Sequence, residues 1–285
     1  MPRKAHIAIA AALFALVTIP ARAQQPWSKV YKVTGRPDVR VETNDAAIEV
    51  DSSDAAQVSA QVVTRGYAIS SDEVRIDRDV QDGNHIELSV HVPSSHWSWG
   101  TSNRSVRILL TVPRSANLNL RSGDGQLRAH GVTGDLQLET SDGSIEVSEL
   151  RGSIRLHTGD GHIEASAVDG SLDASTSDGH LRVRGRFDAL RLETGDGSVT
   201  AEVLSGSKLN GNWSIHTGDG SVTVRLPDGL AADIEAHTGD GTISSQLPLM
   251  VSGILGRRDL TGKLAGGGPT LQIRTGDGSI RLERL

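Results

Sequence analysis

Residues 136–147 read LQLETSDGSIEV, residues 154–165 read IRLHTGDGHIEA, and residues 190–201 read LRLETGDGSVTA. In each segment, apolar and polar residues alternate on both sides of a Thr-x-Asp-Gly signature. Alternation with a period of two is typical of half-buried β-strands, and Asp-Gly is typical of tight turns. Each segment therefore predicts two short strands that meet at a corner.

The signature recurs along the chain, with its aspartates spaced by 18 residues four times and then by 23, 21 and 37 residues. The eight aspartates are Asp124, Asp142, Asp160, Asp178, Asp196, Asp219, Asp240 and Asp277. A ninth, degenerate copy occupies residues 43–46. Self-similarity at a fixed period predicts that equivalent units stack on one another.

Two architectures fit this repeat. An antiparallel meander would use Asp-Gly as a two-residue hairpin turn. The near-identity of consecutive units favours a solenoid, in which equivalent positions stack about 4.8 Å apart. Arg155, Asp173 and Arg191 would then alternate in charge along the stack. We therefore predict an all-β fold, a β-solenoid of about nine short coils with roughly 18 residues per coil.

The two ends of the chain differ from the repeat. Residues 1–23 predict a signal peptide, because a basic start and a short apolar run precede an A-x-A site. We expect an exported protein, periplasmic or at the cell surface, with no transmembrane segment after cleavage. Residues 24–118 predict an irregular β N-terminal capping region, continuous with a repeat solenoid over residues 119–285. Within that solenoid, residues 253–269 interrupt the repeat and predict a long excursion.

Composition narrows the function classes. The 285 residues carry a net charge of −6, no cysteine and only 3% aromatic residues. An acidic balance argues against nucleic acid as a partner, and the absence of cysteine excludes disulfides. The core must be aliphatic.

The TGDGS units and the closing segment over residues 260–282 resemble the bacterial putative-adhesin family, a domain of unknown function. The likeness extends over roughly residues 30–285. The resemblance implies a β-solenoid fold and a place among exported and envelope proteins. It implies no site residues, because the family has no established catalytic residues.

The eight aspartates admit a structural and two functional interpretations. Stacked carboxylates could hold Ca²⁺ along one edge, which would make the protein a calcium-dependent scaffold. They could also serve a carbohydrate-active enzyme, although identical corners do not separate the pKa values of an acid and a nucleophile. We favour turn chemistry, in which Asp bonds its own turn backbone and Gly supplies a positive φ.

Two further features could bind ligands. His162 and His180 follow the corner in adjacent units and could share a transition metal, but they are only two ligands, so we expect no metal site. Residues 94–104 (SSHWSWGTSNR) do not follow the repeat. Their tryptophans could form a ligand-binding tip or a lid over the solenoid end. The candidate ligand-binding residues are His96, Trp97, Trp99, Asn103 and Arg104.

The sequence as a whole predicts an exported, non-catalytic, adhesin-like module without a cofactor. Its role would be binding or structural, in the envelope or outside the cell. We expect its partner to be an envelope glycan or protein of unknown identity.

Overall fold

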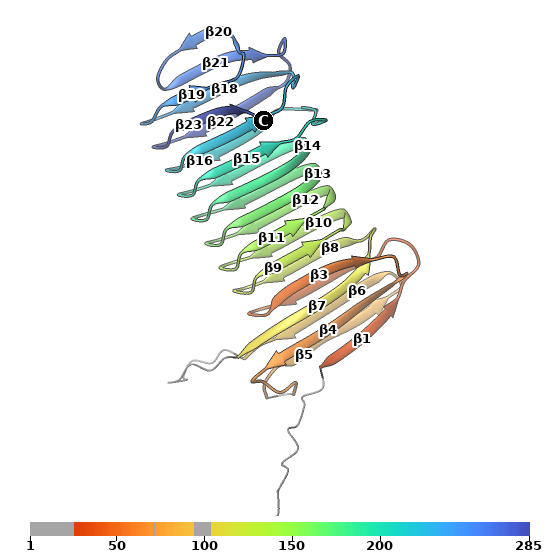
Figure 1. Ribbon diagram of the computed structural model, residues 1–285. Helices are drawn as coiled ribbons and strands as arrows, with labels where there is room; N and C mark the ends of the chain where they lie inside the picture. The colour runs from red at the N-terminus through yellow and green to blue at the C-terminus, as the bar shows by residue number, and fades with distance from the viewer. Residues whose placement is uncertain (1–25, 71, 94–103) are drawn as a thin grey trace, which may run out of the picture.

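The computed structural model describes residues 26–70, 72–93 and 104–285, so the predicted signal peptide lies outside the described residues. All secondary structure elements of the described residues are β-strands, and the strands stack into one elongated solenoid (Figure 1). Ten consecutive strands carry the regular repeat. They are β8 (Asn117–Ser122), β9 (Leu127–His130), β10 (Thr133–Thr140), β11 (Ile145–Ser148), β12 (Arg151–Thr158), β13 (Ile163–Thr176), β14 (Leu181–Thr194), β15 (Val199–Val203), β16 (Trp213–Thr217) and β17 (Val222–Leu226).

The register confirms the solenoid and shows that the meander was wrong. Leu136 of β10 lies opposite Ile154 of β12, and Ile145 of β11 lies opposite Ile163 of β13, in parallel pairs. Each residue therefore pairs with its equivalent one unit later. The strands before the corners form one face of the solenoid, here called the pre-corner face, and the strands after them form the post-corner face.

The order of the coils in space differs from their order in the chain. The last coil, β22 (Thr270–Thr275) and β23 (Ile280–Arg284), lies between β16–β17 and the coil of β18 (Ala232–Thr238) and β19 (Ile243–Ser245). At the other end, β2 (Asp38–Thr43) and β3 (Ala47–Ser53) lie between β8–β9 and the layer of β6 (His85–His91) and β7 (Ser105–Pro113). Near each end, one coil is thus inserted between two others (Figure 1).

Antiparallel strands flank this parallel stack. At the N-terminal end β4 (Gln57–Arg65) pairs with β7 and with β1 (Trp27–Lys32), and β5 (Arg75–Asp82) pairs with β6. At the C-terminal end, the excursion forms β20 (Met250–Leu255) and β21 (Asp259–Leu264), and β21 pairs with β18. Covering the last parallel coils in this way leaves fewer open edges for aggregation.

A buried tyrosine joins two of the three N-terminal flanking strands, β1 and β5. Tyr31 of β1 donates its Oη hydrogen to Asp79 Oδ1 of β5 at 2.7 Å, and Lys29 Nζ lies 2.7 Å from Asp79 Oδ2. Burial, and then the bond to Asp79, raise the pKa of Tyr31 above its usual range. The two faces are therefore tied together at this end by side chains.

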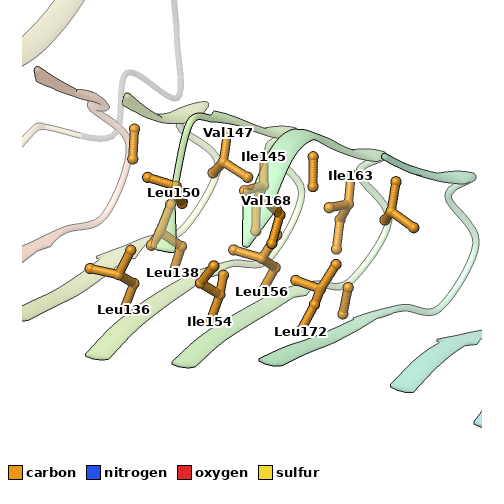
Figure 2. Close-up of a cluster of buried hydrophobic side chains, with 14 of the residues drawn as sticks. Leu136, Leu138, Ile145, Val147, Leu150, Ile154, Leu156, Ile163, Val168 and Leu172 are labelled. Atoms are coloured by element: carbon orange, nitrogen blue, oxygen red, sulfur yellow. The ribbon is translucent and has the colours of Figure 1, made fainter. Parts of the chain in front are cut away.

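The core consists of aliphatic rows that run along the solenoid axis. Leu136, Ile154 and Leu172 occupy equivalent positions in three layers, and each is at most 2% exposed. Leu138, Ile145 and Val147 point into the same interior from both faces (Figure 2). The rows explain why so few aromatic residues suffice.

Threonine, rather than aspartate, holds the corners. Thr176 Oγ1 donates to Gly161 O of the preceding corner at 2.7 Å and accepts the Gly179 N–H of its own corner at 3.2 Å. The same donation to a neighbouring corner is made by Thr140, Thr158, Thr194, Thr217, Thr238 and Thr275. All seven threonines are buried. The bond to the turn backbone that we expected from aspartate is thus made by the threonine three positions before the corner glycine.

The corner glycines are required by close packing, so the expectation of a positive φ was wrong. Their φ values lie outside the left-handed region, which in the repeat is used at the other turn, by Gly152 and Gly170. A Cβ on Gly179 would lie 1.9 Å from Gly161 O. Only glycine lets consecutive corners approach this closely.

We predict that Gly179→Ala destabilises the protein by about 3 kcal/mol or more, because backbone must move to admit the methyl group. Gly211→Ala is the matched control, since no atom lies within 4 Å of its Cβ position, and its effect should stay within about 0.5 kcal/mol. Urea unfolding measures both. Equal stabilities of the two variants would contradict the packing role.

We predict that Tyr31→Phe changes the alkaline stability profile. A raised pKa favours the neutral phenol in the folded state, so its contribution is complete below about pH 10 and is lost as the pH rises further. Above that pH, wild-type unfolding free energy should therefore fall more steeply than that of the variant, by up to about 1.4 kcal/mol per pH unit. Parallel profiles in urea titrations would count against a protonated, buried Tyr31.

Candidate functional site

The corner aspartates line one edge of the solenoid. All eight are exposed, and their order along the axis is that of the coils, with Asp277 between Asp219 and Asp240. The degenerate corner adds Asp45, whose pKa is raised by partial burial and by the nearby charge of Asp124. Among the described residues, no group of three or more His, Asp or Glu side chains could hold a metal ion. The edge is an acidic stripe, open to solvent.

The two histidines after the corners stack as their spacing predicts. The rings of His162 and His180 are 4.8 Å apart, with 7° between their planes, and both side chains are exposed. Within the part of the chain that the structure describes, no third ligand joins them.

Most of the tryptophan segment lies outside the described residues. His96, Trp97, Trp99 and Asn103 belong to it, so their role stays a prediction. Arg104 is described, and its guanidinium carbon lies 5.1 Å from the centre of the Tyr67 ring. Asn44 binds the backbone just after β6, because its side-chain amide accepts from Val92 N at 2.8 Å and donates to Val92 O at 2.7 Å.

A groove on the pre-corner face was not anticipated from the sequence. It has a cavity volume of about 570 Å³ and crosses five neighbouring strands, β6, β2, β8, β10 and β12. We call it the amide groove. Its polar lining comprises Asp38, Arg40, His85, Asn117, Asn119, Asp135, Gln137, Ser153 and Arg155.

The strand register arranges these side chains in two rows along the solenoid axis. The outer row is His85, Asp38, Asn117, Asp135 and Ser153, and the inner row is Arg40, Asn119, Gln137 and Arg155. Neighbours in a row come from adjacent strands and are therefore spaced by about 4.8 Å. The groove thus presents one polar side chain of each row in the layers of β2, β8, β10 and β12, and His85 alone in the layer of β6.

Only part of this lining is hydrogen-bonded within the protein. Asn117 Nδ2 donates to Asp38 Oδ1 at 2.6 Å and Arg40 Nη2 contacts Glu42 Oε1 at 2.5 Å. The remaining side chains have no hydrogen-bond or ion-pair partner among the described residues: His85, Asn119, Asp135, Gln137, Ser153 and Arg155. Outside the groove, cross-layer ion pairs recur on both faces, as between Arg191 and Asp173 on the pre-corner face, and they are most frequent on the post-corner face. Examples are Arg128–Glu146, Arg184–Glu202 and Arg225–Glu283.

Asn119 carries the clearest sign of a missing partner. Its Oδ1 atom is buried, and it is the one buried side-chain nitrogen or oxygen of the described residues that lacks a hydrogen bond. Leaving such an acceptor unsatisfied costs about 1–3 kcal/mol. A group of this kind calls for a partner from outside the chain, such as water or a ligand.

Part of this site was visible in the sequence. Asn119 and Gln137 are 18 residues apart at outward positions, where Arg155, Asp173 and Arg191 follow. Two adjacent amides in a row of charges are a signal that could have been noticed. His85 and Arg40 could not be recognised as groove residues from the sequence. They reach the groove because β2 is inserted between β6 and β8, and the repeat does not indicate this pairing.

The family model of Toastrack DUF4097 matches residues 38–283. The chain belongs to this family. Toastrack domains are β-solenoid-like, in agreement with the fold and with the resemblance drawn from the repeats. In the described part of this Toastrack chain, no helix is long and apolar enough to cross a membrane.

Three solved structures are similar to this Toastrack chain. A putative cell adhesion protein from Clostridium sporogenes is 14% identical, covers 92% of this chain and 100% of its own, and has a TM-score of 0.31. A putative adhesin from Bacteroides fragilis is 11% identical, covers 92% of this chain and 98% of its own, and has a TM-score of 0.38. A putative lipid binding protein from Parabacteroides distasonis is 14% identical, covers 91% of this chain and 97% of its own, and has a TM-score of 0.42. No curated protein matches the chain.

We predict that chelation of divalent cations leaves the melting temperature unchanged within about 1 °C, because a ligand that does not bind the folded state cannot stabilise it. The exposed, separated corner aspartates provide no three-ligand group. Scanning calorimetry with EDTA and with millimolar calcium measures this. A calcium-dependent rise that disappears in Asp160→Asn/Asp178→Asn would instead establish a cation ladder.

Proposed function

We propose that this Toastrack protein is a rigid, non-catalytic binding module and that the amide groove is its ligand-binding surface. The observation that carries the proposal is the buried, unpartnered Asn119 Oδ1 within a concave row of polar side chains. Concave sites with a few convergent polar groups are the usual form of ligand sites. Parallel strands hold these groups in place before any ligand arrives.

Two further parts of the proposal rest on the sequence. The signal-like segment over residues 1–23 supports export to the periplasm or the cell surface, where an adhesin-like module would meet envelope glycans or proteins. A non-catalytic role is supported by the sameness of the corner aspartates, which are all exposed, because acid–base chemistry needs carboxyl groups in different environments.

We predict that Asn119→Val stabilises the protein and weakens ligand binding. Valine suits a strand and removes the unsatisfied acceptor, so the free energy of unfolding should rise by about 1 kcal/mol. Loss of the groove amide should lower affinity about tenfold. Urea unfolding measures the first effect. Binding to immobilised peptidoglycan, envelope glycans and host-matrix components measures the second.

Ser214→Val is the matched control, since Ser214 lies in the same outward row, outside the groove. It should leave binding unchanged. Trp97→Ala/Trp99→Ala tests the predicted tip in the same assay: weaker binding with an unchanged melt would add those indoles to the site. Binding by wild type that is insensitive to Asn119→Val would place the site elsewhere. No binding at all would remove the binding role.

A further inference from the structure

We infer that the ligand of the amide groove is a neutral, hydroxyl-rich polymer, a glycan chain that lies along the solenoid axis across the strands. This inference rests on the proposed function and adds the chemical class and the direction of the ligand. It follows from the direction of the rows, the charge of the free side chains and the hydrogen-bonding capacity of the lining.

The direction follows from the strand register. Asn119 lies opposite Arg40 on one side and opposite Gln137 on the other, and Gln137 lies opposite Arg155. The inner row therefore crosses four layers and spans about 14 Å, three spacings of about 4.8 Å. A compact ligand would contact one or two of these groups. An extended chain along the axis can contact all of them.

The charge of the unpartnered side chains points to a neutral ligand. Arg155 and Asp135 cancel, and the other unpartnered members are amides, a hydroxyl and a histidine. Asp38 adds a carboxylate that accepts from the neutral amide of Asn117, so the groove has no excess of positive charge. Arg40, the other guanidinium in the groove, already contacts Glu42. A polyanion would find one free guanidinium beside a free carboxylate, on a chain of net charge −6 with an acidic stripe along its edge. A polycation would face the opposite mismatch at Arg155.

The backbone excludes the usual mode of peptide recognition. Extended peptides add to an exposed sheet edge through main-chain hydrogen bonds. Strands β2, β8 and β10 each have parallel neighbours on both sides, so their backbone groups are already used. What remains accessible on this face is side chains.

The free side chains suit hydroxyl groups. An amide offers both donors and acceptors, a carboxylate accepts, a guanidinium donates, and a sugar hydroxyl can do either. Asn119 Oδ1 needs a donor, and Asp135 next to the amides accepts as well. A neutral glycan supplies both roles on successive units, and many weak contacts along a rigid row add up to useful affinity.

The test measures binding of the purified protein to neutral glucose, mannose, galactose and N-acetylglucosamine oligomers, to polygalacturonate and to an extended Ser/Thr-rich peptide. We expect binding to at least one neutral oligomer that grows with chain length up to the length of the row. Raising the salt concentration should change this affinity less than about twofold, because no net charge is neutralised. Gln137→Ala and Arg155→Ala should each lower it roughly tenfold.

Gln272→Ala is the matched control, because Gln272 occupies the equivalent outward position in β22, outside the groove. It should bind like wild type. Binding to polygalacturonate or the peptide that is lost in Gln137→Ala would overturn the neutral-glycan inference and keep the groove as a site. Neutral-oligomer binding that Gln137→Ala and Arg155→Ala leave unchanged would overturn the assignment of the glycan to the groove. No binding to any probe would overturn this inference, and no binding to the envelope and matrix panel as well would overturn the proposed function.

Discussion

The close approach of successive corners is the constraint on which the rest of the structure depends. A buried threonine hydroxyl bridges each corner to the next, as Thr176 does to Gly161 O at 2.7 Å. The corner glycine leaves room for the neighbouring carbonyl. Once this contact repeats, every layer places its strands at the same height and turns the same residues inward. Leu136, Ile154 and Leu172 then form a continuous row without any large side chain to fill gaps.

The sequence predicts this architecture well because the repeat carries it directly. Alternation shows the strands, and the 18-residue step shows that position 145 lies beside position 163. The role of the corner residues could not be read in the same way. Thr176 and Asp178 both occur in a polar corner, and only burial separates them, since Thr176 is 5% exposed and Asp178 lies open to solvent.

The inserted coils and the groove could not be predicted from the sequence for a related reason. Strands β2 and β8 pair residues that are 79 positions apart in the sequence, and the spacing of the repeat does not predict this pairing. The same pairing brings Arg40 beside Asn119. The two amides could be seen in the sequence, but their significance lies in the missing partner of Asn119 Oδ1, which only the packed structure reveals.

The contrast between the amide groove and the ion-paired surface outside it connects the fold to recognition. On the post-corner face, pairs such as Arg128 and Glu146 match charges between layers, which stabilises a surface slightly. In the amide groove the chain instead tolerates an unsatisfied buried acceptor, at a cost larger than such a pair returns. Concentrating unmatched groups in one concavity makes physical sense where a ligand completes their hydrogen bonds. The corners already fix the spacing of the layers, so a ligand that fits this spacing orders little of the protein on binding. The free energy of each weak contact is therefore not offset by a loss of conformational entropy in the protein.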